Sequence, residues 1–123
     1  MASDRLDPLG LQIPPQRLTC RSEFLHVAAK GRKIPTKGLV LQALACPDQN
    51  AVRLGFTVTK KVGNAVVRNR TKRRLREAAR LYLREHQVAP ADLVLIGRDG
   101  TRARRFELLI ADLAQAIEKA GLR

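Results

Sequence analysis

The amino-acid sequence predicts an α+β sandwich in which helices pack against a single sheet. Hydrophobic and polar residues alternate across residues 52–59, as in a half-buried strand, whereas hydrophobic residues recur at helical spacing across 64–86 and 105–120. With 123 residues, the chain is long enough for one domain with one modest core. The expected order of elements is a helix, two or three strands, a helix, a strand and a final helix.

The first part of the chain combines a proline-rich arm with a short helix. Residues 1–16 contain three prolines and no sustained periodicity, so we expect a flexible arm there and a single folded domain over 17–123. The helix that follows has Ser22 as its expected N-cap and ends at Gly31. Its apolar side is formed by Phe24, Leu25, Val27 and Ala28.

The strands are predicted from apolar runs that lie between turn residues. Residues 32–38 are a basic connection with room for a very short edge strand, and residues 39–45 form a strand that ends at the turn 46–50. In the strand 52–59, Leu54, Phe56 and Val58 face one side. Residues 93–96 are all apolar, which predicts a short strand at the centre of the sheet.

Two longer helices complete the predicted fold. Gly63 and Asn64 end the preceding strand and begin a long helix that runs to about His86, and Pro90 marks its far boundary. The last helix spans about 105–120. The hydrophobic residues that keep helical spacing in it are Phe106, Leu109, Ile110, Leu113 and Ile117.

The charge of the chain indicates a polyanionic partner. Lys and Arg number 24 against 11 acids, which gives a formal net charge of +13. So much charge of one sign is expected of a protein that neutralises phosphates, so nucleic acid is the first hypothesis. A membrane surface is disfavoured because no stretch of about twenty apolar residues is present. Cys20 and Cys46 fit no metal spacing and are expected to be reduced thiols of a cytoplasmic protein.

The positive charge is concentrated in residues 60–76, which contain eight Lys and Arg residues and no acid. On the long helix, the expected core-facing stripe is Val67, Thr71, Leu75, Ala78, Leu81 and Tyr82. The opposite arc carries Arg68, Asn69, Lys72, Arg73, Arg76, Arg80 and Arg84. Arg74 falls at the border, where its stem can pack while its guanidinium reaches outward.

An ordinary solvated helix face would mix the two signs of charge. Here the cations also lie at the positive end of the helix dipole, which is unfavourable. We therefore favour a phosphate-binding surface over a bland one. Arg102, Arg104 and Arg105 form a second basic cluster before the last helix, where we expect an auxiliary nucleic-acid contact.

Residues 55–70, GFTVTKKVGNAVVRNR, followed by Lys72-Arg73 and Leu75-Arg76-Glu77, closely resemble the signature of the bacterial ribonuclease P protein subunit. The resemblance covers roughly residues 17–123. It implies an αβββαβα fold with a left-handed β-α-β crossover, a rare exception to the usual handedness. It also implies the protein subunit of an endoribonuclease in which a large RNA with Mg²⁺ removes the 5′ leader of precursor tRNA. The protein side chains would then supply no catalytic group and no metal site.

The resemblance also assigns the candidate binding residues. The face on the catalytic RNA would consist of Arg68, Asn69, Arg70, Lys72, Arg73 and Arg76. The cleft for the 5′ leader would contain Phe24, Lys60, Lys61 and Asn64. Arg98 either extends the basic rim of this cleft or is an ordinary turn arginine, and Phe24 is either a stacking platform or a core residue. Ala28 and Leu39 stand where Phe or Tyr is typical, so the leader would be held mainly through its backbone.

Two other classes of function compete with this interpretation. A basic ribosomal or nucleoid protein would have a similar composition. Only the Arg-Asn-Arg motif with its preceding strand distinguishes this chain from such a protein. A stand-alone metal nuclease requires several carboxylates that converge on a metal ion. Asp92, Asp99, Glu107 and Asp112 are scattered along the sequence, and neither His26 nor His86 has a partner, so we expect no cleavage by the protein alone. We expect no DNA partner.

Overall fold

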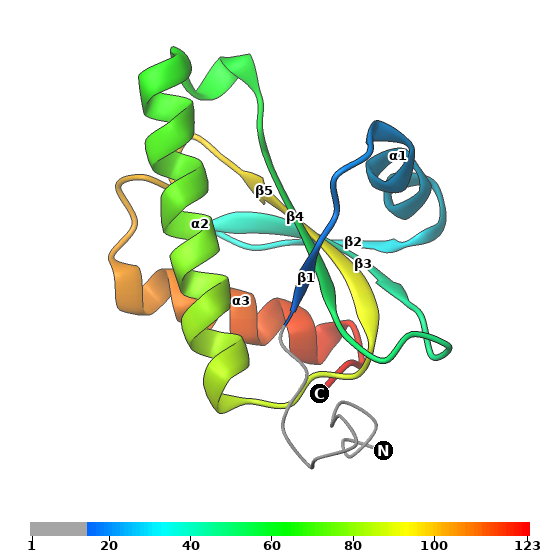
Figure 1. Ribbon diagram of the computed structural model, residues 1–123. Coiled ribbons are helices and arrows are strands. Elements are labelled where there is room, and N and C mark those ends of the chain that lie inside the picture. The colour runs from blue at the N-terminus through cyan, green and yellow to red at the C-terminus, as the bar shows by residue number, and fades with distance from the viewer. Residues whose placement is uncertain (1–14) are drawn as a thin grey trace.

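The structure of the protein is a computed structural model that describes residues 15–123. Three helices and one five-stranded sheet form the fold (Figure 1). The elements are β1 (Gln16–Arg17), α1 (Arg21–Lys30), β2 (Arg32–Pro35), β3 (Leu39–Ala45), β4 (Arg53–Val58), the 3₁₀ turn η2 (Lys60–Val62), α2 (Ala65–Glu85), β5 (Ala91–Gly97) and α3 (Phe106–Lys119). The predicted α+β class and the predicted order of elements are confirmed, with β1 as an additional strand.

The sheet has the strand order β1-β4-β5-β3-β2, so the apolar strand β5 is central, as predicted. Strand β5 pairs in parallel with β4 and antiparallel with β3. Helix α2 connects the parallel pair, which makes β4–α2–β5 a crossover unit between adjacent strands. Strand β2 is the short edge strand expected in the basic connection.

The start of the chain differs from the prediction in two respects. Most of the predicted arm lies outside the described residues, but Gln16 pairs with Arg53 in β1, so the sheet extends into residue 16. Helix α1 is capped at Cys20 and not at Ser22. The carboxylate of Glu23 accepts the N–H groups of Thr19 and Cys20, both at 2.9 Å, and therefore fixes the start of the helix earlier.

The two faces of the sheet are covered unequally. Helices α2 and α3 pack on one face, where the main core lies, and α1 packs on the other (Figure 1). The main core includes the fully buried Leu41, Leu75, Leu95 and Leu113. Among the described residues, the core beneath α1 consists of Leu18, Val27 and Val94, with Phe24, Leu44 and Ile96 partly buried against it. Part of the α1 face of the sheet is therefore open.

Helix α2 packs its predicted apolar stripe against the sheet, but the set of buried residues in its second half differs from the prediction. Thr71, Leu75, Ala78 and Tyr82 are buried as expected, but Val67 is only half-buried, and so is Leu81. In its place Ala79 and Leu83 are buried, and they belong to the same core as the buried residues of α3. Ideal helical spacing could not show that the second half of α2 also packs against α3.

A network of charged residues ties α1 to the sheet on its less covered side. Arg53 of β4 donates from Nε and Nη2 to the carboxylate of Asp92 on β5, at 2.8 and 2.7 Å. Its Nη1 reaches Glu23 of α1 at 2.9 Å. Burial of Asp92 opposes ionisation, but the hydrogen bonds and the charge of Arg53 outweigh this, so the pKa of Asp92 is lowered.

Replacing Arg53 with Met is expected to lower the free energy of unfolding by about 1 to 3 kcal/mol at neutral pH, because Asp92 would remain buried without its cation. Because the pKa of Asp92 is lower in the folded state than in the unfolded state, ionised Asp92 stabilises the fold at pH values above its unfolded-state pKa of about 4. This stabilisation is lost as the pH falls through the folded-state pKa. The cost of Arg53→Met should therefore shrink in acid.

Urea unfolding at neutral and acidic pH measures this difference. The control is Arg80→Met, which breaks the exposed Arg80–Glu77 pair and should leave the unfolding midpoint unchanged. A cost of Arg53→Met that is the same at both pH values would contradict the role given to Asp92.

Candidate nucleic-acid interface

The outward face of α2 carries the residues that the sequence assigns to RNA. Asn69, Arg70, Arg73 and Arg76 are exposed, while Arg68 and Lys72 are half-buried. Asn64 caps the helix by accepting the N–H of Val67 at 3.0 Å. The first turn contains no acid. The predicted separation of an apolar and a basic side is therefore confirmed, and all six residues lie on one helix.

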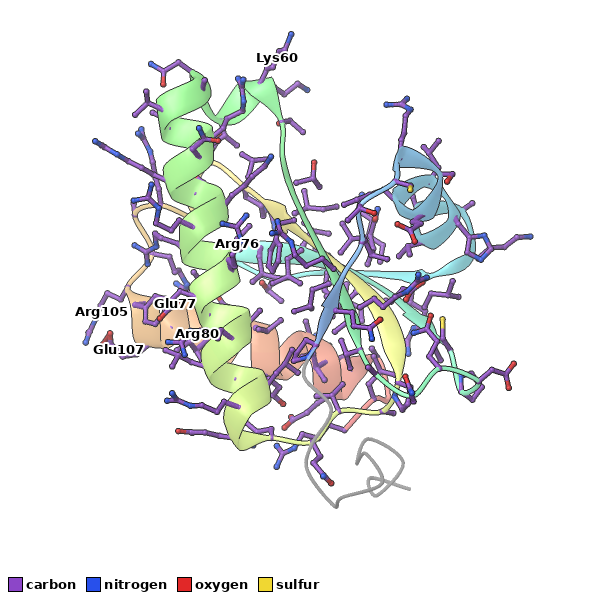
Figure 2. All side chains as sticks on the ribbon, viewed as in Figure 1. Lys60, Arg76, Glu77, Arg80, Arg105 and Glu107 are labelled. Atoms are coloured by element: carbon purple, nitrogen blue, oxygen red, sulfur yellow. The ribbon has the colours of Figure 1, made fainter. Side chains whose placement is uncertain are left out.

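The acids of the described residues do not neutralise this surface. On α2 the only ion pair within the described part of the chain joins Arg80 to Glu77 at 2.5 Å, and Figure 2 shows both on the outer side of the helix. The hydrogen bond from Arg80 lowers the pKa of Glu77. None of the ion pairs within residues 15–123 involves any of the six predicted residues. Their charges are available to an external anion.

Two of these cations are placed by contacts with their own chain. Arg68 donates from Nη1 to the carbonyl of Gly63 at 2.9 Å, which holds its guanidinium beside the start of the helix. The guanidinium of Arg76 lies over the ring of half-buried Phe56, 5.6 Å from its centroid. The basic face is therefore partly ordered before any ligand binds.

Arg74 does not extend to solvent, in contrast to the prediction. Its guanidinium donates to the main-chain carbonyls of Arg102, at 3.0 Å, and Arg104, and it lies 5.8 Å from the ring centroid of Phe106. The sequence could not show that the loop before α3 passes alongside α2 at this position. Arg74 is therefore a connection between α2 and that loop.

A groove of about 500 Å³ lies between α1 and the less covered face of the sheet. Phe24 lines it and also packs against β4, since a Cβ at Gly55 would lie only 2.5 Å from its Cε2. The ring of Phe24 therefore belongs both to the small core and to the groove wall. The groove is lined by Thr19, Arg21, Phe24, Leu25, Ala28, Gln42, Phe56, Thr57, Val94 and Ile96.

Ala28 and Leu39 were both expected to line the groove in place of aromatic residues, and this expectation is wrong for one of them. Ala28 lines the groove, but Leu39 is fully buried in the main core on the other face of the sheet. Along β3 the residues alternate, so Leu39, Leu41 and Ala43 face the main core while Gln42 faces the groove. Leu39 therefore cannot be a groove residue.

The other predicted cleft residues lie beyond the end of the groove. Lys60 and Lys61 are exposed on η2, directly after β4, and Figure 2 shows Lys60 at the tip of this turn. Asn64 uses its side-chain oxygen as the helix cap. Arg98 follows β5 and donates to the carbonyl of Thr36 at 2.6 Å. Because Val58 pairs with Gly97, strands β4 and β5 end side by side before Lys60 and Arg98, but Arg98 lies beside Pro35, Thr36 and Lys37 and does not line the groove.

Several groove residues were not found by the sequence analysis. Thr19 and Arg21 flank the start of α1, and Gln42 and Thr57 project from β3 and β4. The alternation of each strand contained the signal for Gln42 and Thr57, because they are polar positions between core residues. What the alternation could not show is that α1 leaves this part of the sheet face uncovered.

The donor set of the described residues does not fit a metal ion. Within residues 15–123 no group of three or more His, Cys, Asp or Glu side chains comes together. His26 is exposed, and the ring of His86 lies 4.5 Å from that of Tyr82. Asp92 and Asp112 are each paired with an arginine. We therefore derive no step through a metal on this chain. None of the helices in the described region could cross a bilayer.

Comparison with known proteins identifies relatives along nearly the whole described chain. Residues 14–121 match the family Ribonuclease P. The ribonuclease P protein component of Gluconacetobacter diazotrophicus is 63% identical over 107 residues, which cover 87% of this chain and 92% of that protein. The corresponding component of Paramagnetospirillum magneticum is 46% identical over 109 residues, which cover 85% and 82%.

Solved structures share the fold. The RNase P protein of Thermotoga maritima superposes with a TM-score of 0.69 at 26% identity, over 85% of this chain and 96% of that one. The Staphylococcus aureus RNase P protein gives a TM-score of 0.72 at 24% identity, over 86% and 95%. The similarity therefore includes α1, the sheet and the basic helix together.

Proposed function

We propose a role in RNA binding for this chain, which belongs to the ribonuclease P protein family and is the protein subunit of that ribonucleoprotein. In this role, the outward face of α2 docks on the catalytic RNA. The groove between α1 and the sheet holds the 5′ leader of precursor tRNA. The observation that carries the proposal is the unneutralised basic face of α2. The five cations among the six predicted residues lie within about two and a half helical turns, and none of them forms an ion pair with a described residue.

The chemistry of the face suits an RNA backbone. Arginine presents a planar fork of donors that matches two phosphate oxygens, and its charge persists at any physiological pH. Arg70, Arg73 and Arg76 are exposed and successive along the helix, so they can contact several phosphates of one folded RNA. Each neutralised phosphate releases condensed counterions, which makes binding salt-dependent.

The groove suits a single strand that is held with little base stacking. Phe24 is the one aromatic residue of α1 that lines the groove, and Ala28, which also lines it, offers no platform. Gln42 and Thr57 supply hydrogen-bonding groups on the groove floor, and Arg21 lies at its side. Beyond the groove, exposed Lys60 and Lys61 on η2 would take leader phosphates, with Arg98 after β5 as a further cation.

In this proposal the protein binds and positions, and the RNA with Mg²⁺ performs the hydrolysis. The residues of this chain hold the leader backbone against α1 and anchor the catalytic RNA on α2. Both contacts orient the substrate relative to the active site of the RNA. The protein therefore contributes to the rate by positioning the substrate and not by transferring protons. A basic ribosomal or nucleoid role is not favoured, because the relatives are components of ribonuclease P.

Reconstitution tests the proposal directly. The protein is added to ribonuclease P RNA at low Mg²⁺ with a 5′-labelled precursor tRNA, and the released leader is measured. We expect faster 5′ cleavage than with the RNA alone, and no cleavage by the protein alone. Failure to stimulate the RNA, or robust turnover by the nuclease-free protein, would overturn the proposal.

Replacing both Arg68 and Arg70 with Ala is expected to weaken binding to the catalytic RNA and to reduce the slope of log Kobs against log salt by about 1.4 to 1.8, because two phosphate contacts are lost. Filter binding across a salt series measures both quantities. The matched control replaces Lys119, the last residue of α3, and Arg123, which removes the same formal charge outside α2. Equal slopes for the two double variants would exclude these contacts.

Phe24→Ala is expected to impair cleavage of precursors with long leaders more than those with a leader of one nucleotide. A stacking contact that loses its ring costs about 1 to 3 kcal/mol, so KM for the long-leader substrate should rise about fivefold or more. The comparison of the two substrates separates this effect from misfolding. An equal loss on both would indicate a defect of the small core and not of the groove.

A further inference from the structure

A recess of about 410 Å³ lies between α2 and the loop of residues 98–105, which joins β5 to α3. Figure 1 shows this loop beside the upper half of α2. Among the described residues, those that line the recess include no acid. They are Val67, Arg70, Arg73, Arg74 and Arg102. Four arginines from two separate elements therefore surround one hollow.

The three arginines of the loop are not equivalent. Arg104 is bound by buried Asp112, at 2.9 Å from Nε and 3.1 Å from Nη2. Arg105 pairs with Glu107 on the exposed start of α3, as Figure 2 shows. Arg102 alone of the three lines the recess, and it forms no ion pair with a described residue. The predicted basic cluster thus reduces to one available guanidinium.

Arg74 fixes the loop that carries Arg102. It donates to the carbonyls of Arg102 and Arg104, and its Nε is buried without a hydrogen-bond partner within residues 15–123. Both contacts are made to the main chain, so they position the Cα of Arg102 without using its side chain. The loop is therefore held against α2 before any ligand arrives, which lowers the entropy cost of binding.

We infer that this recess is a phosphate-binding site for the ribonuclease P RNA, with Arg102 as a contact beyond the α2 face and Arg74 as its positioning residue. The inference rests on the proposed function, because it requires the RNA to lie on α2. Arg70 and Arg73 belong to both surfaces, so an RNA backbone that crosses α2 reaches the recess without a gap in positive charge. Several guanidinium groups that converge on one recess without an acid form a site that favours the phosphodiester groups of RNA as ligands.

The test uses the full-length protein and labelled ribonuclease P RNA in a salt series. Arg102→Ala should lower affinity about threefold to tenfold and reduce the salt slope by about 0.7 to 0.9, which is the effect of one lost phosphate contact. The fold should be unaffected, because Arg74 binds the carbonyl of residue 102 and not its side chain. Arg102→Lys keeps the charge and should restore most of the slope.

Arg105→Ala is the matched control, since it removes one arginine from the same loop outside the recess. It should leave affinity and slope near the wild-type values. Arg74→Leu tests the positioning role in a double-mutant cycle. If Arg74 places Arg102, then Arg102→Ala should have a smaller effect in the Arg74→Leu background than in the wild type. Additive effects would reject the positioning role.

The outcomes separate this inference from the proposed function. If the wild-type protein fails to bind ribonuclease P RNA, the proposed function fails. If the wild type binds and Arg102→Ala keeps its affinity and slope, the recess is not a phosphate site, while the function stands. A change of slope that appears only when precursor tRNA is added to the preformed holoenzyme would overturn the assignment to the ribonuclease P RNA.

Discussion

The packing of α2 on the parallel pair β4 and β5 is the interaction on which the rest of the structure depends. Leu75 and Ala78 are fully buried in that contact, and burial of one leucine contributes about 1.5 to 3 kcal/mol. Cations in the first turn oppose the helix dipole by about 0.3 to 1 kcal/mol each. Burial of the apolar stripe therefore outweighs the unfavourable position of Arg68 in the first turn, and it fixes which side of the helix faces outward.

The two faces of the sheet then have different tasks. The face under α2 and α3 holds nearly all of the buried leucines, so it supports the basic helix as a rigid element. The face under α1 is closed only around Val27, and the uncovered part is the groove. Arg53 connects Glu23 of α1 with Asp92 of the central strand, so the charged network sets the distance between the helix and the groove floor.

The sequence predicted the fold and the basic face well because both depend on periodicity. The bounds of β3 and the apolar run of β5 follow from local patterns, as does the placement of Arg73 and Arg76 outside. Prediction from the sequence failed where a contact joins residues that are far apart in the chain. Arg74 binds a loop about thirty residues later, and Leu39 faces the main core because of strand parity and sheet position. The cap at Cys20 required the side chain of Glu23, which propensity alone does not reveal.

Site-specific photocrosslinking tests the central claim that the outward face of α2 is the RNA surface. A benzophenone amino acid replaces exposed Asn69 on α2 in one variant and exposed Gln115 on α3 in another, and each is irradiated with ribonuclease P RNA. The account predicts crosslinked RNA from position 69 and none above background from position 115. Efficient crosslinking from position 115 with none from position 69 would contradict it.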